Sequence, residues 1–490
     1  MSVNTLFGRA VGGNVRACVV PSLQCERPVR KIILATARRK YSDYTVAPRE
    51  VKESNDFLPK QPSQSQAVVV PASGLERLPT VNILRNLLLG SLFTSPLLFR
   101  MGMTILSGIA NSRSALLNPD ANPILRALVK PLVYDQFCAG TNQHEIYKTR
   151  DTIKRMGFSG IILCYGKEIQ VSTSGDLHST GRGDANQTLE INMWRDGNLK
   201  TLDMVGEGDW LGMKLTGAGP GVTNALMKNE EPPEEFTAAM NAICDKALSK
   251  NCRIWVDAEQ QVLQTAIDRW TIDVMRRYNK NGKALVYNTI QAYLKASRTK
   301  LQDQLATAEK EGWTLAIKLV RGAYIANDQR NLIHDTKQNT DNSYNSIVRD
   351  LLSGTNLGFT PEQFPRMQLF LAGHNPESVA RAWDLVQSLS SQHKLKVLPD
   401  FGQLQGMADE LGCKVVKRCE DLDAQKDVKP DVVIPKAYKC LTWGSIQECM
   451  QYLLRRIIEN RGGADRMKDG MAANWAELRR RVTGGRALSR

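Results

Sequence analysis

The stretch YLLRRIIEN, residues 452–460, carries two adjacent arginines that could bind an anion. Six aliphatic residues around them follow helical spacing and predict a helix over residues 446–460 with an apolar stripe on the core: Ile446, Met450, Leu453, Leu454, Ile457 and Ile458. The opposite arc of that helix carries Tyr452, Arg455, Arg456 and Glu459. This arc is either a solvated face with an ion pair or a clamp for a carboxylate, since planar guanidinium groups bind carboxylates with directed hydrogen bonds.

Polar residues also interrupt or end several apolar, strand-like runs. They are Lys214 in LGMKLT, Asp257 in IWVDAE, Gln291, Lys318 before VRGAY, and His374 with Asn375 after LFLAG. A charge in a buried strand needs a partner or a function. Each residue alone has an ordinary explanation, namely a structural ion pair for Lys214, a helix cap for Asp257 and a buried, hydrogen-bonded imidazole for His374. No HxH or HExxH spacing occurs, so we expect no metal site.

Strand-like and helix-like runs alternate through the second half of the chain. The predicted strands are 159–165, 211–217, 253–258, 285–293, 315–324, 368–373, 396–399 and 432–438. The predicted helices are 235–248, 261–277, 293–311, 343–352, 377–390 and 446–460. This alternation predicts an α/β fold, a (βα)8 TIM-type barrel whose active site lies at the carboxyl ends of its strands. The family resemblance given below further implies that the last helix lies over the barrel mouth.

The formal net charge of the 490 residues is +15, and much of it is N-terminal. Residues 1–41 hold eight basic side chains against the single acid Glu26, which predicts a mitochondrial transit peptide, with a DNA-binding arm as the alternative. Residues 42–80, rich in proline, glutamine and serine, are predicted to be a flexible linker, 81–155 a helical region, 156–465 the barrel and 466–490 a basic C-terminal tail. The last fifteen residues of that tail are predicted to be solvated, or to touch anionic lipid.

Two further features bound the environment of the protein. Ten scattered cysteines without a CxxC pair argue against a zinc or iron–sulfur site and fit a reducing compartment. The uncharged apolar stretch 86–99 is shorter than the ~20 residues of a spanning helix, so we expect a buried or membrane-surface helix there.

Seven motifs in order give the chain a family resemblance over roughly residues 81–465. They are WVDAEQ (255–260), NTIQAYL (288–294), AIKLVRGAYI (316–325), IHDTKQNTDNSYN (333–345), AGHN (372–375), FGQLQGM (401–407) and YLLRRIIEN (452–460). With these motifs the chain resembles the flavin-dependent proline dehydrogenase family, as a fungal-type mitochondrial member or paralogue.

The resemblance implies an activity and a location. It implies a barrel that holds FAD without a covalent bond and oxidises L-proline to 1-pyrroline-5-carboxylate, the first step of proline catabolism. It further implies that the electrons pass to a quinone, that the enzyme associates peripherally with the matrix side of the inner mitochondrial membrane, and that nucleic acid is not a partner.

The same resemblance implies roles for residues at matching positions. For the substrate, Arg455 and Arg456 look like the carboxylate-binding pair with Lys214 as a third cation, and the pocket residues are Asp257, Tyr324, Leu404 and Tyr452. For the flavin, Lys318 matches the basic residue near N5, Gln291 the residue at the ring edge and Glu459 the residue at the adenosine end. The remaining cofactor-lining residues are Val320, Gly322, Ala323, His374 and Asn375.

Cys440 departs from the family pattern, which usually has a tyrosine at this position. A smaller side chain leaves space near the substrate ring, so we expect that a substituted proline, such as a 4-hydroxyproline, is accepted comparably or better than proline. Alternatively, Tyr438 fills the gap, or Cys440 merely weakens proline binding. Two other classes stay open, a flavin-binding paralogue of low activity and a metal-dependent barrel lyase or hydrolase.

Overall fold

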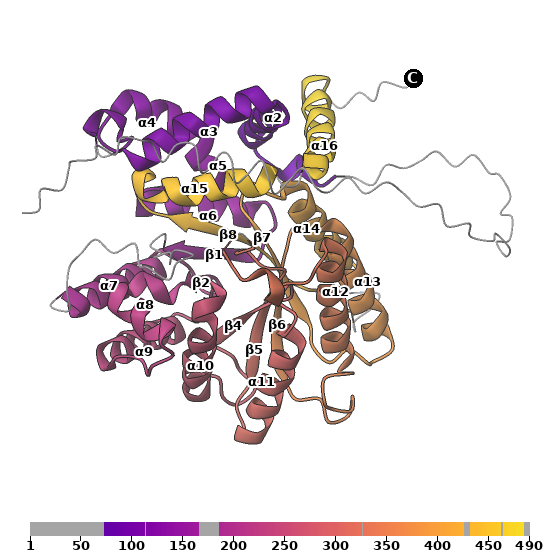
Figure 1. Cartoon of the computed structure of the whole chain (residues 1–490). Coiled ribbons are helices and arrows are strands. Elements are labelled where there is room, and N and C mark those ends of the chain that lie inside the picture. The colour runs from indigo at the N-terminus through magenta and orange to yellow at the C-terminus, as the bar shows by residue number, and fades with distance from the viewer. Residues whose placement is uncertain are drawn as a thin grey trace, which may run out of the picture. The chain divides into compact units, whose positions relative to one another are not determined.

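The computed structural model describes residues 73–112, 114–165, 186–325, 327–425, 432–461 and 464–484, without the side chains of residues 93, 451 and 459–469 (Figure 1). The predicted transit peptide and nearly all of the predicted linker lie outside these residues. In the described part, eight parallel strands pair in sequence order, and the last pairs with the first to close a barrel. They are β1 Gly160–Tyr165, β2 Trp210–Met213, β3 Arg253–Val256, β4 Val286–Gln291, β5 Leu315–Val320, β6 Met367–Ala372, β7 Pro399–Leu404 and β8 Ala437–Trp443. The predicted (βα)8 fold is confirmed.

Helices surround the barrel and extend it at both ends of the described chain (Figure 1). Around the barrel lie α6 Gln143–Arg155, α7 Gln187–Met204, α8 Pro220–Met227, α9 Glu234–Ser249, α10 Gln261–Tyr278, α11 Ser297–Glu311, α12 Lys337–Ser353, α13 Pro376–Ser391 and α14 Asp409–Asp423. Before it come η1 Leu75–Arg77, α2 Thr80–Thr94, α3 Pro96–Asn111, η2 Ala115–Leu117, α4 Pro123–Val129, the π-helical η3 Lys130–Tyr134 and α5 Asp135–Phe137; after it come α15 Ile446–Arg461 and α16 Ala464–Val482.

The predicted positions of the last two strands, 396–399 and 432–438, were wrong. Strand β7 begins at Pro399, where the prediction ends, and β8 runs on to Trp443. Polar residues hid both strands, because Asp400 in β7 and Lys439 in β8 break the apolar pattern. The structure pairs each of them: Asp400 accepts a 3.1 Å hydrogen bond from Arg253, and Lys439 donates one of 2.7 Å to Asp409. Strand β2 is also shorter than predicted, since the chain turns into a 3-10 helix after Lys214.

Aromatic side chains fill the amino-terminal part of the barrel. The rings of Trp210 and Tyr287 lie 4.7 Å apart between centroids, those of Trp255 and Phe370 5.1 Å apart, and the guanidinium of Arg253 lies 4.0 Å above Trp210. The four aromatic side chains are closely packed and buried, and Arg253 is half-buried. Space for a ligand inside the barrel is therefore left toward the carboxyl ends of the strands.

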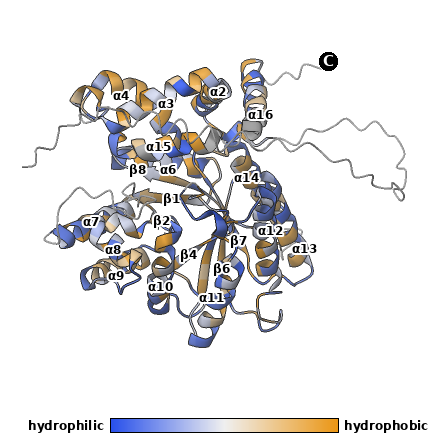
Figure 2. Ribbon diagram, in the orientation of Figure 1, coloured by the Kyte–Doolittle hydropathy of each residue, from blue (hydrophilic) through white to orange (hydrophobic). Residues whose placement is uncertain are grey.

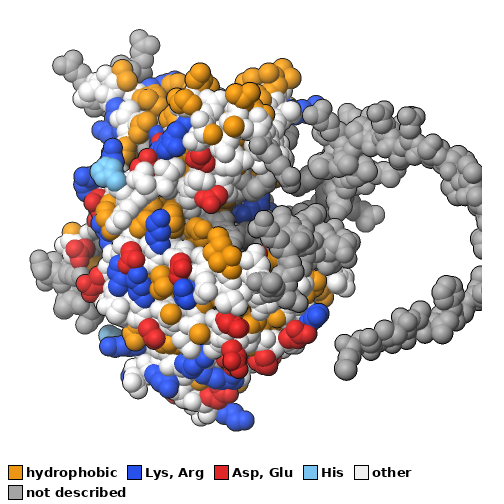
Figure 3. Space-filling model, turned by 90° about the vertical axis from the view of Figure 1, so that its left-hand side faces the viewer, with side chains coloured by type: hydrophobic (Ala, Val, Ile, Leu, Met, Phe, Trp, Pro, Cys, Tyr) orange, Lys and Arg blue, Asp and Glu red, His pale blue; other side chains and the backbone are white. Residues whose placement is uncertain are grey.

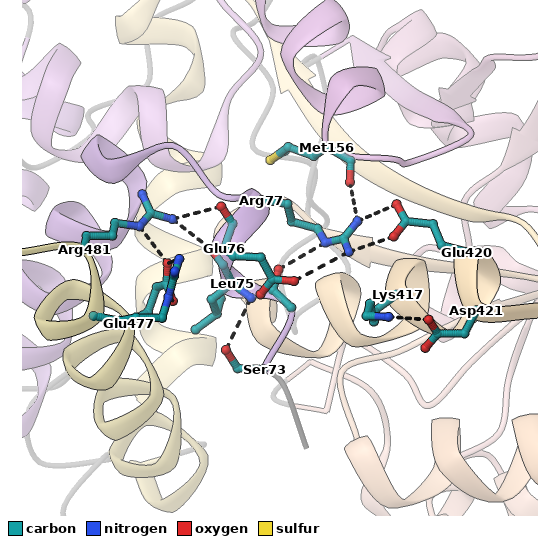
Figure 4. Close-up of polar contacts among 12 residues, drawn as sticks. Ser73, Leu75, Glu76, Arg77, Met156, Lys417, Glu420, Asp421, Glu477 and Arg481 are labelled. Carbon is teal, nitrogen blue, oxygen red and sulfur yellow. Dashed lines mark hydrogen bonds and ion pairs between the residues drawn. The ribbon is translucent and has the colours of Figure 1, made fainter. Parts of the chain in front are cut away.

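The predicted basic C-terminal tail, residues 466–490, is helical over most of its length, since residues 464–482 form α16. The solvated tail predicted for the last fifteen residues was therefore wrong as far as residue 482. Figure 4 shows how this helix is held: Arg481 bonds to Glu477 on the same helix and donates to the carbonyl oxygens of Leu75, Glu76 and Leu78 at 3.0, 3.2 and 2.7 Å. On the other side of η1, Arg77 donates hydrogen bonds of 2.7 and 3.0 Å to the carboxylate of Glu420 in α14. Thus η1 links the C-terminal helix to the barrel.

The apolar stretch 86–99 is divided between two helices, since Ser95 and Pro96 end α2 and begin α3. The Ser95 hydroxyl caps α3, and proline is well tolerated in a first helical turn. Apolar residues recur along both helices (Figure 2). None of the described helices is by itself long and apolar enough to cross a membrane; α2 and α3 pass that test only as a pair, bent by 106°.

Candidate active site

The alternation of side chains along the strands brings the predicted residues into the barrel. Strand residues two apart face the same side of a sheet. Trp255, Tyr287 and Ala316 belong to the buried cluster that fills the barrel. Each is followed, two or four positions later on the same side of its strand, by a predicted polar residue. These polar residues are Asp257, Gln291 and Lys318, respectively. The predicted polar residues therefore lie above the aromatic floor, at the carboxyl ends of β3, β4 and β5.

Lys318 is the most buried cation of the predicted set, with a side chain that is 6% exposed. It forms an ion pair with Asp257, and its ammonium lies 3.9 Å from the centroid of the Trp255 ring. Asp257, after β3, is therefore the counterion of a lysine on β5, with β4 between the two strands, where a helix cap was the alternative. A carboxylate and an aromatic face together offset the cost of removing the ammonium from water.

Lys214 and Tyr324 meet although they lie 110 positions apart. The Lys214 ammonium donates a 2.8 Å hydrogen bond to the hydroxyl of Tyr324. Lys214 directly follows β2, and Tyr324 is a buried residue in the loop after β5. Two residues predicted to touch the substrate are thus neighbours, and the contact helps to fix the position of the Lys214 ammonium.

Helix α15 has the two faces that its periodicity predicts, with one exception. Five residues of the apolar stripe are buried, but Ile458 is 56% exposed. The stripe packs against side chains of α2, α3 and η3, away from the barrel wall. The opposite arc is half-buried at Tyr452, Arg455 and Arg456, so the fully solvated face proposed as an alternative is wrong.

This arc faces β8. Burial raises the pKa of the Tyr452 hydroxyl far above its ordinary value, and Cys440 and Thr442 of β8 lie near that hydroxyl. The guanidinium of Arg456 lies 5.2 Å from the centroid of the Tyr452 ring. The paired arginines therefore stand at the same end of the barrel as Lys318 and Lys214. Glu459 belongs to α15 by its backbone, and its side chain lies outside the described residues.

The predicted cofactor-lining stretches after β5 and β6 are tied together. Arg321, between Val320 and Gly322, donates to Asp341 at 2.8 Å and to the Ser378 hydroxyl at 2.6 Å. The backbone N–H of Ser378 also donates a 3.0 Å hydrogen bond to the side-chain oxygen of Asn375, which caps α13. Burial acts to raise the pKa of Asp341, but hydrogen bonds from Lys337 and Arg321 hold it below its ordinary value.

Two predicted cofactor residues have constrained neighbours. The Nε2 atom of His374 accepts a 3.1 Å hydrogen bond from the backbone N–H of Leu404, so this imidazole joins β6 to β7. Gly322 has φ of 143°, and a Cβ there would collide with the Tyr293 ring. Ala323, the next residue, is exposed. Only glycine suits this close approach of backbone to an aromatic ring.

Cys440 lies beside a second cysteine on the neighbouring strand, on the same inner side of the barrel. Its sulfur lies 3.8 Å from that of Cys164 on β1, and this contact together with burial raises the pKa of the Cys164 thiol. Leu404 pairs with Cys440 in the register of β7 and β8. With Ala372 on β6, the two cysteines place small side chains above the aromatic floor.

Glu259 was not among the predicted site residues. Its buried carboxylate accepts hydrogen bonds from the backbone N–H groups of Leu215 and Thr216 at 2.9 and 3.2 Å, and its carbonyl oxygen accepts one of 3.4 Å from Gln291. It therefore fixes the turn after Lys214. The sequence did offer a signal for Glu259, since it is the second acidic residue of the stretch DAE, residues 257–259. Trp255, under the Lys318 ammonium, was missed because a tryptophan in a barrel strand is more often only core.

The donors at this end of the barrel suit a planar cofactor with polar edges. Gln291 supplies an amide, Lys318 a cation, and Gly322 a backbone without a side chain. The hydroxyl of Tyr452 is buried. Within the described residues, no three or more His, Cys, Asp and Glu side chains gather as a metal site would require. The set therefore fits a flavin better than a metal ion.

Comparison with known proteins gives consistent matches. The family model of proline dehydrogenase matches residues 150–469. The probable mitochondrial proline dehydrogenase of Schizosaccharomyces pombe is 27% identical over 405 residues, which cover 71% of this chain and 79% of that protein. The mitochondrial proline dehydrogenase 1 of Caenorhabditis elegans is 28% identical over 57% of this chain and 43% of that protein, and that of Homo sapiens 28% identical over 51% and 39%.

A solved structure has the same fold. The proline utilization A protein of Bdellovibrio bacteriovorus, inactivated by N-propargylglycine, matches with a TM-score of 0.56 at 13% identity, over 80% of this chain and 41% of that chain. The chain thus spans less than half the length of the nematode and human relatives and of this structure, but most of the fission-yeast relative.

Proposed function

The chain belongs to the proline dehydrogenase family of oxidoreductases, and from that premise we propose that it oxidises L-proline to 1-pyrroline-5-carboxylate with FAD and passes the electrons to a quinone. One observation carries the proposal. The paired guanidinium groups of Arg455 and Arg456 are half-buried on the arc of α15 that faces β8, at the barrel end that also holds the Lys318–Asp257 pair.

The substrate follows from the charges at this end of the barrel. Arg455 and Arg456 present planar donors for the proline carboxylate, and Lys214 adds a third cation, positioned by Tyr324. Positive groups near the substrate also disfavour a protonated amine, and hydride loss requires the neutral amine. Tyr452 and Leu404 then confine the ring. Orientation of the carbon next to nitrogen is the main contribution of these residues.

Other residues are assigned to the cofactor. FAD, when bound, accepts the hydride. Lys318 would lie near the flavin ring with its charge balanced by Asp257, Gln291 would bond the ring edge, and Val320, Gly322, Ala323, His374 and Asn375 would line the site. The Asn375 side chain also caps α13, so its part in binding is to hold this turn. Glu459 is assigned to the adenosine end.

The proposal includes the place of the protein in the cell. The relatives named above are called mitochondrial, and residues 1–41 have the composition of a transit peptide. We restrict the predicted linker to residues 42–72, because Leu75 and Leu78 are buried and η1 is bonded to α14 and α16. We place the enzyme on the matrix side of the inner membrane, where a quinone acceptor is available.

A second candidate substrate is favoured by Cys440. The small side chains of Cys440, Cys164 and Ala372 stand where a larger side chain would fill the barrel. A 4-hydroxyproline or another substituted proline is therefore proposed to be oxidised comparably or better than proline. A preference for proline above about tenfold in kcat/KM over every hydroxyproline contradicts this candidate.

The test is anaerobic bleaching of the flavin in stopped flow, first with L-proline and then with trans-4-hydroxy-L-proline. We expect a yellow protein whose flavin is bleached, and Arg455→Lys and Arg456→Lys variants whose substrate Kd rises at least about tenfold, because lysine lacks the planar fork. Arg381→Lys, at an exposed pair with Glu377, is the matched control. A yellow protein that neither substrate bleaches supports the paralogue of low activity, and a colourless protein with bound metal refutes the flavin assignment.

A further inference from the structure

Asp120 is an isolated acidic residue in the N-terminal helical region. No aspartate or glutamate lies between Glu76 and Asp120. Hydrophobic side chains instead gather at the top of the molecule in Figure 3, where α2, α3 and α4 lie in Figure 1. Asp120 belongs to the loop between η2 and α4, and its side chain is only 25% exposed. A carboxylate in such surroundings needs partners.

The partners of Asp120 are at the start of α15. Its carboxylate accepts a hydrogen bond of 3.1 Å from the backbone N–H of Ile446 and one of 2.9 Å from that of Gln447, one on each oxygen. These are the first two residues of the helix, and their N–H groups have no acceptor within it. A negative charge at this end also interacts favourably with the helix dipole. Asp120 therefore holds the first turn of α15 from a loop that lies 326 positions earlier in the chain.

The loop itself keeps Asp120 in place for this contact. The backbone N–H of Asp120 donates a 2.8 Å hydrogen bond to the side-chain oxygen of Asn118, whose carbonyl oxygen accepts another of 2.8 Å from the N–H of Asn122. The guanidinium of Arg126 on α4 lies 3.8 Å from the Asp120 carboxylate. A turn of this kind limits the conformations of its residues, so the carboxylate lies at a defined point beside the helix.

Three further contacts join the same junction to the N-terminal region. The buried hydroxyl of Tyr134 donates a 2.7 Å hydrogen bond to the carbonyl oxygen of Gly444, and the backbone N–H of Ala139 donates one of 2.8 Å to that of Thr442. The Gln447 side chain donates to two carbonyl oxygens in the last turn of α3, both at 3.4 Å. Polar contacts from the N-terminal region thus meet the chain on both sides of the turn between β8 and α15.

Directional contacts at this turn matter because of what α15 carries. Apolar packing along its stripe is not directional and permits small rotations of the helix. The capping box of Ser445 and Glu448 fixes only the local start of the helix. Arg455 and Arg456 follow about 14 Å along the helix from Ile446, at 1.5 Å per residue. A tilt at the first turn therefore displaces both guanidinium groups, and a misplacement of about 1 Å is costly in a site that orients its substrate.

We propose that Asp120 is a positioning residue of the substrate site: by holding the first turn of α15, it sets where Arg455 and Arg456 meet the substrate carboxylate. Asp120 acts through the helix and not on the substrate. The inference rests on the proposed function, which assigns the two arginines to that carboxylate. It also makes the N-terminal region, which precedes the residues matched by the family model, part of what the site requires.

The test compares Asp120→Ala, which loses both hydrogen bonds, with Asp120→Asn, which keeps one oxygen as an acceptor. Binding of L-proline, or of trans-4-hydroxy-L-proline if that is bound better, is measured by calorimetry on protein whose flavin has been reduced, since reduced flavin cannot accept a hydride. We expect Asp120→Ala to raise Kd at least about fivefold, and Asp120→Asn to raise it clearly less. The limiting rate of flavin bleaching should change less than about twofold, because the arginines hold the carboxylate equally in the ground state and the transition state.

The matched control is Asn142→Ala. Asn142 caps α6 through a 3.1 Å hydrogen bond from the backbone N–H of Glu145, and α6 carries none of the residues assigned to the site. Loss of a cap should lower Tm in both alanine variants, but only Asp120→Ala should raise Kd. An effect of charge alone has the opposite sign, because removal of an acid strengthens the binding of an anion; Kd would then fall, and by the same factor in Asp120→Ala and Asp120→Asn.

Three outcomes would overturn the proposal. They are an Asp120→Ala variant with the Kd of the wild type, an Asn142→Ala variant whose Kd rises as much, and a Kd that falls in both Asp120 variants. Wild-type protein that binds its substrate but whose oxidised flavin is not bleached refutes the proposed reaction alone. Wild-type protein that binds neither amino acid refutes the substrate assignment and the positioning role together.

Discussion

At the scale of single residues, the site is built from charges that the barrel partly removes from water. Lys318 is held between the Asp257 carboxylate and the Trp255 ring, and Lys214 is bonded to the Tyr324 hydroxyl. A buried charge is tolerated only with such partners. The contacts fix the direction in which each ammonium group points. The proposed site needs such fixed charges, because it would bind an anion next to a flat cofactor.

The Lys318–Asp257 pair can be tested with a double-mutant cycle. Asp257→Ala leaves the Lys318 ammonium without its carboxylate, and we expect the free energy of unfolding to fall by about 2 kcal/mol, less than for a fully buried pair because Asp257 is 23% exposed. Adding Lys318→Met should restore most of this loss. The same cycle on the exposed Arg381–Glu377 pair should give at most about 0.5 kcal/mol. Chemical denaturation measures both, and a double variant as unstable as Asp257→Ala would contradict the account.

At the scale of elements, turns and helix faces decide which residues meet. The loop after β5 brings Tyr324 to Lys214 and Arg321 to Ser378, and α15 places an apolar stripe on the N-terminal helices and a polar arc toward β8. The loop depends on a backbone conformation at Gly322 that only glycine adopts easily.

Gly322→Ala tests that dependence. Its φ of 143° disfavours alanine, and the new methyl group would collide with the Tyr293 ring. We expect a loss of at least about 2 kcal/mol in stability and a lower flavin content in the purified protein. Gly208→Ala is the matched control, with φ of 76° and nothing within 4 Å of the new carbon, and should lose about 1 kcal/mol with normal flavin content. Equal losses in both variants would show that the contact with Tyr293 is unimportant.

At the scale of the whole described unit, polar contacts hold the C-terminal helix to the N-terminal segment. Arg481 joins Glu477 of α16 to the carbonyl groups of η1, and Arg77 joins η1 to Glu420 of α14 (Figure 4). The Glu477 side chain is buried although it is a carboxylate. These contacts stabilise the packing around α2.

The pH dependence of stability follows from Glu477. Hydrogen bonds from Arg480 and Arg481 hold the pKa of this carboxyl below its ordinary value, so in the acid range the unfolded chain binds more protons than the folded one. Its stabilising effect is complete above the unfolded pKa of about 4.3 and is lost as pH falls through the lower folded pKa. Glu477→Gln should therefore lower Tm by about 2–4 °C at pH 7 and have little effect near pH 3. A pH-independent difference would assign the loss to packing.

Periodicity and motif order by themselves determined the barrel, the two-faced helix α15 and the residues assigned to the site. A period of 3.6 or 2 in apolar residues reflects burial on one side of an element, and that information is local in the chain. It failed for β7 and β8, where Asp400 and Lys439 are buried with partners from elsewhere, and at Ile458, which the pattern places in the core.

Only the tertiary structure decided which residues are partners. The pairing of Lys318 with Asp257, of Lys214 with Tyr324, of Cys440 with Cys164 and of Arg481 with η1 joins positions from 61 to 406 residues apart. The tertiary structure also decided which apolar side of α2, α3 and α4 is buried and which is exposed. The sequence leaves this choice open, because these helices are apolar on both sides. Contacts of this kind depend on how strands close and helices dock, and the spacing of residue types along a chain does not contain that geometry.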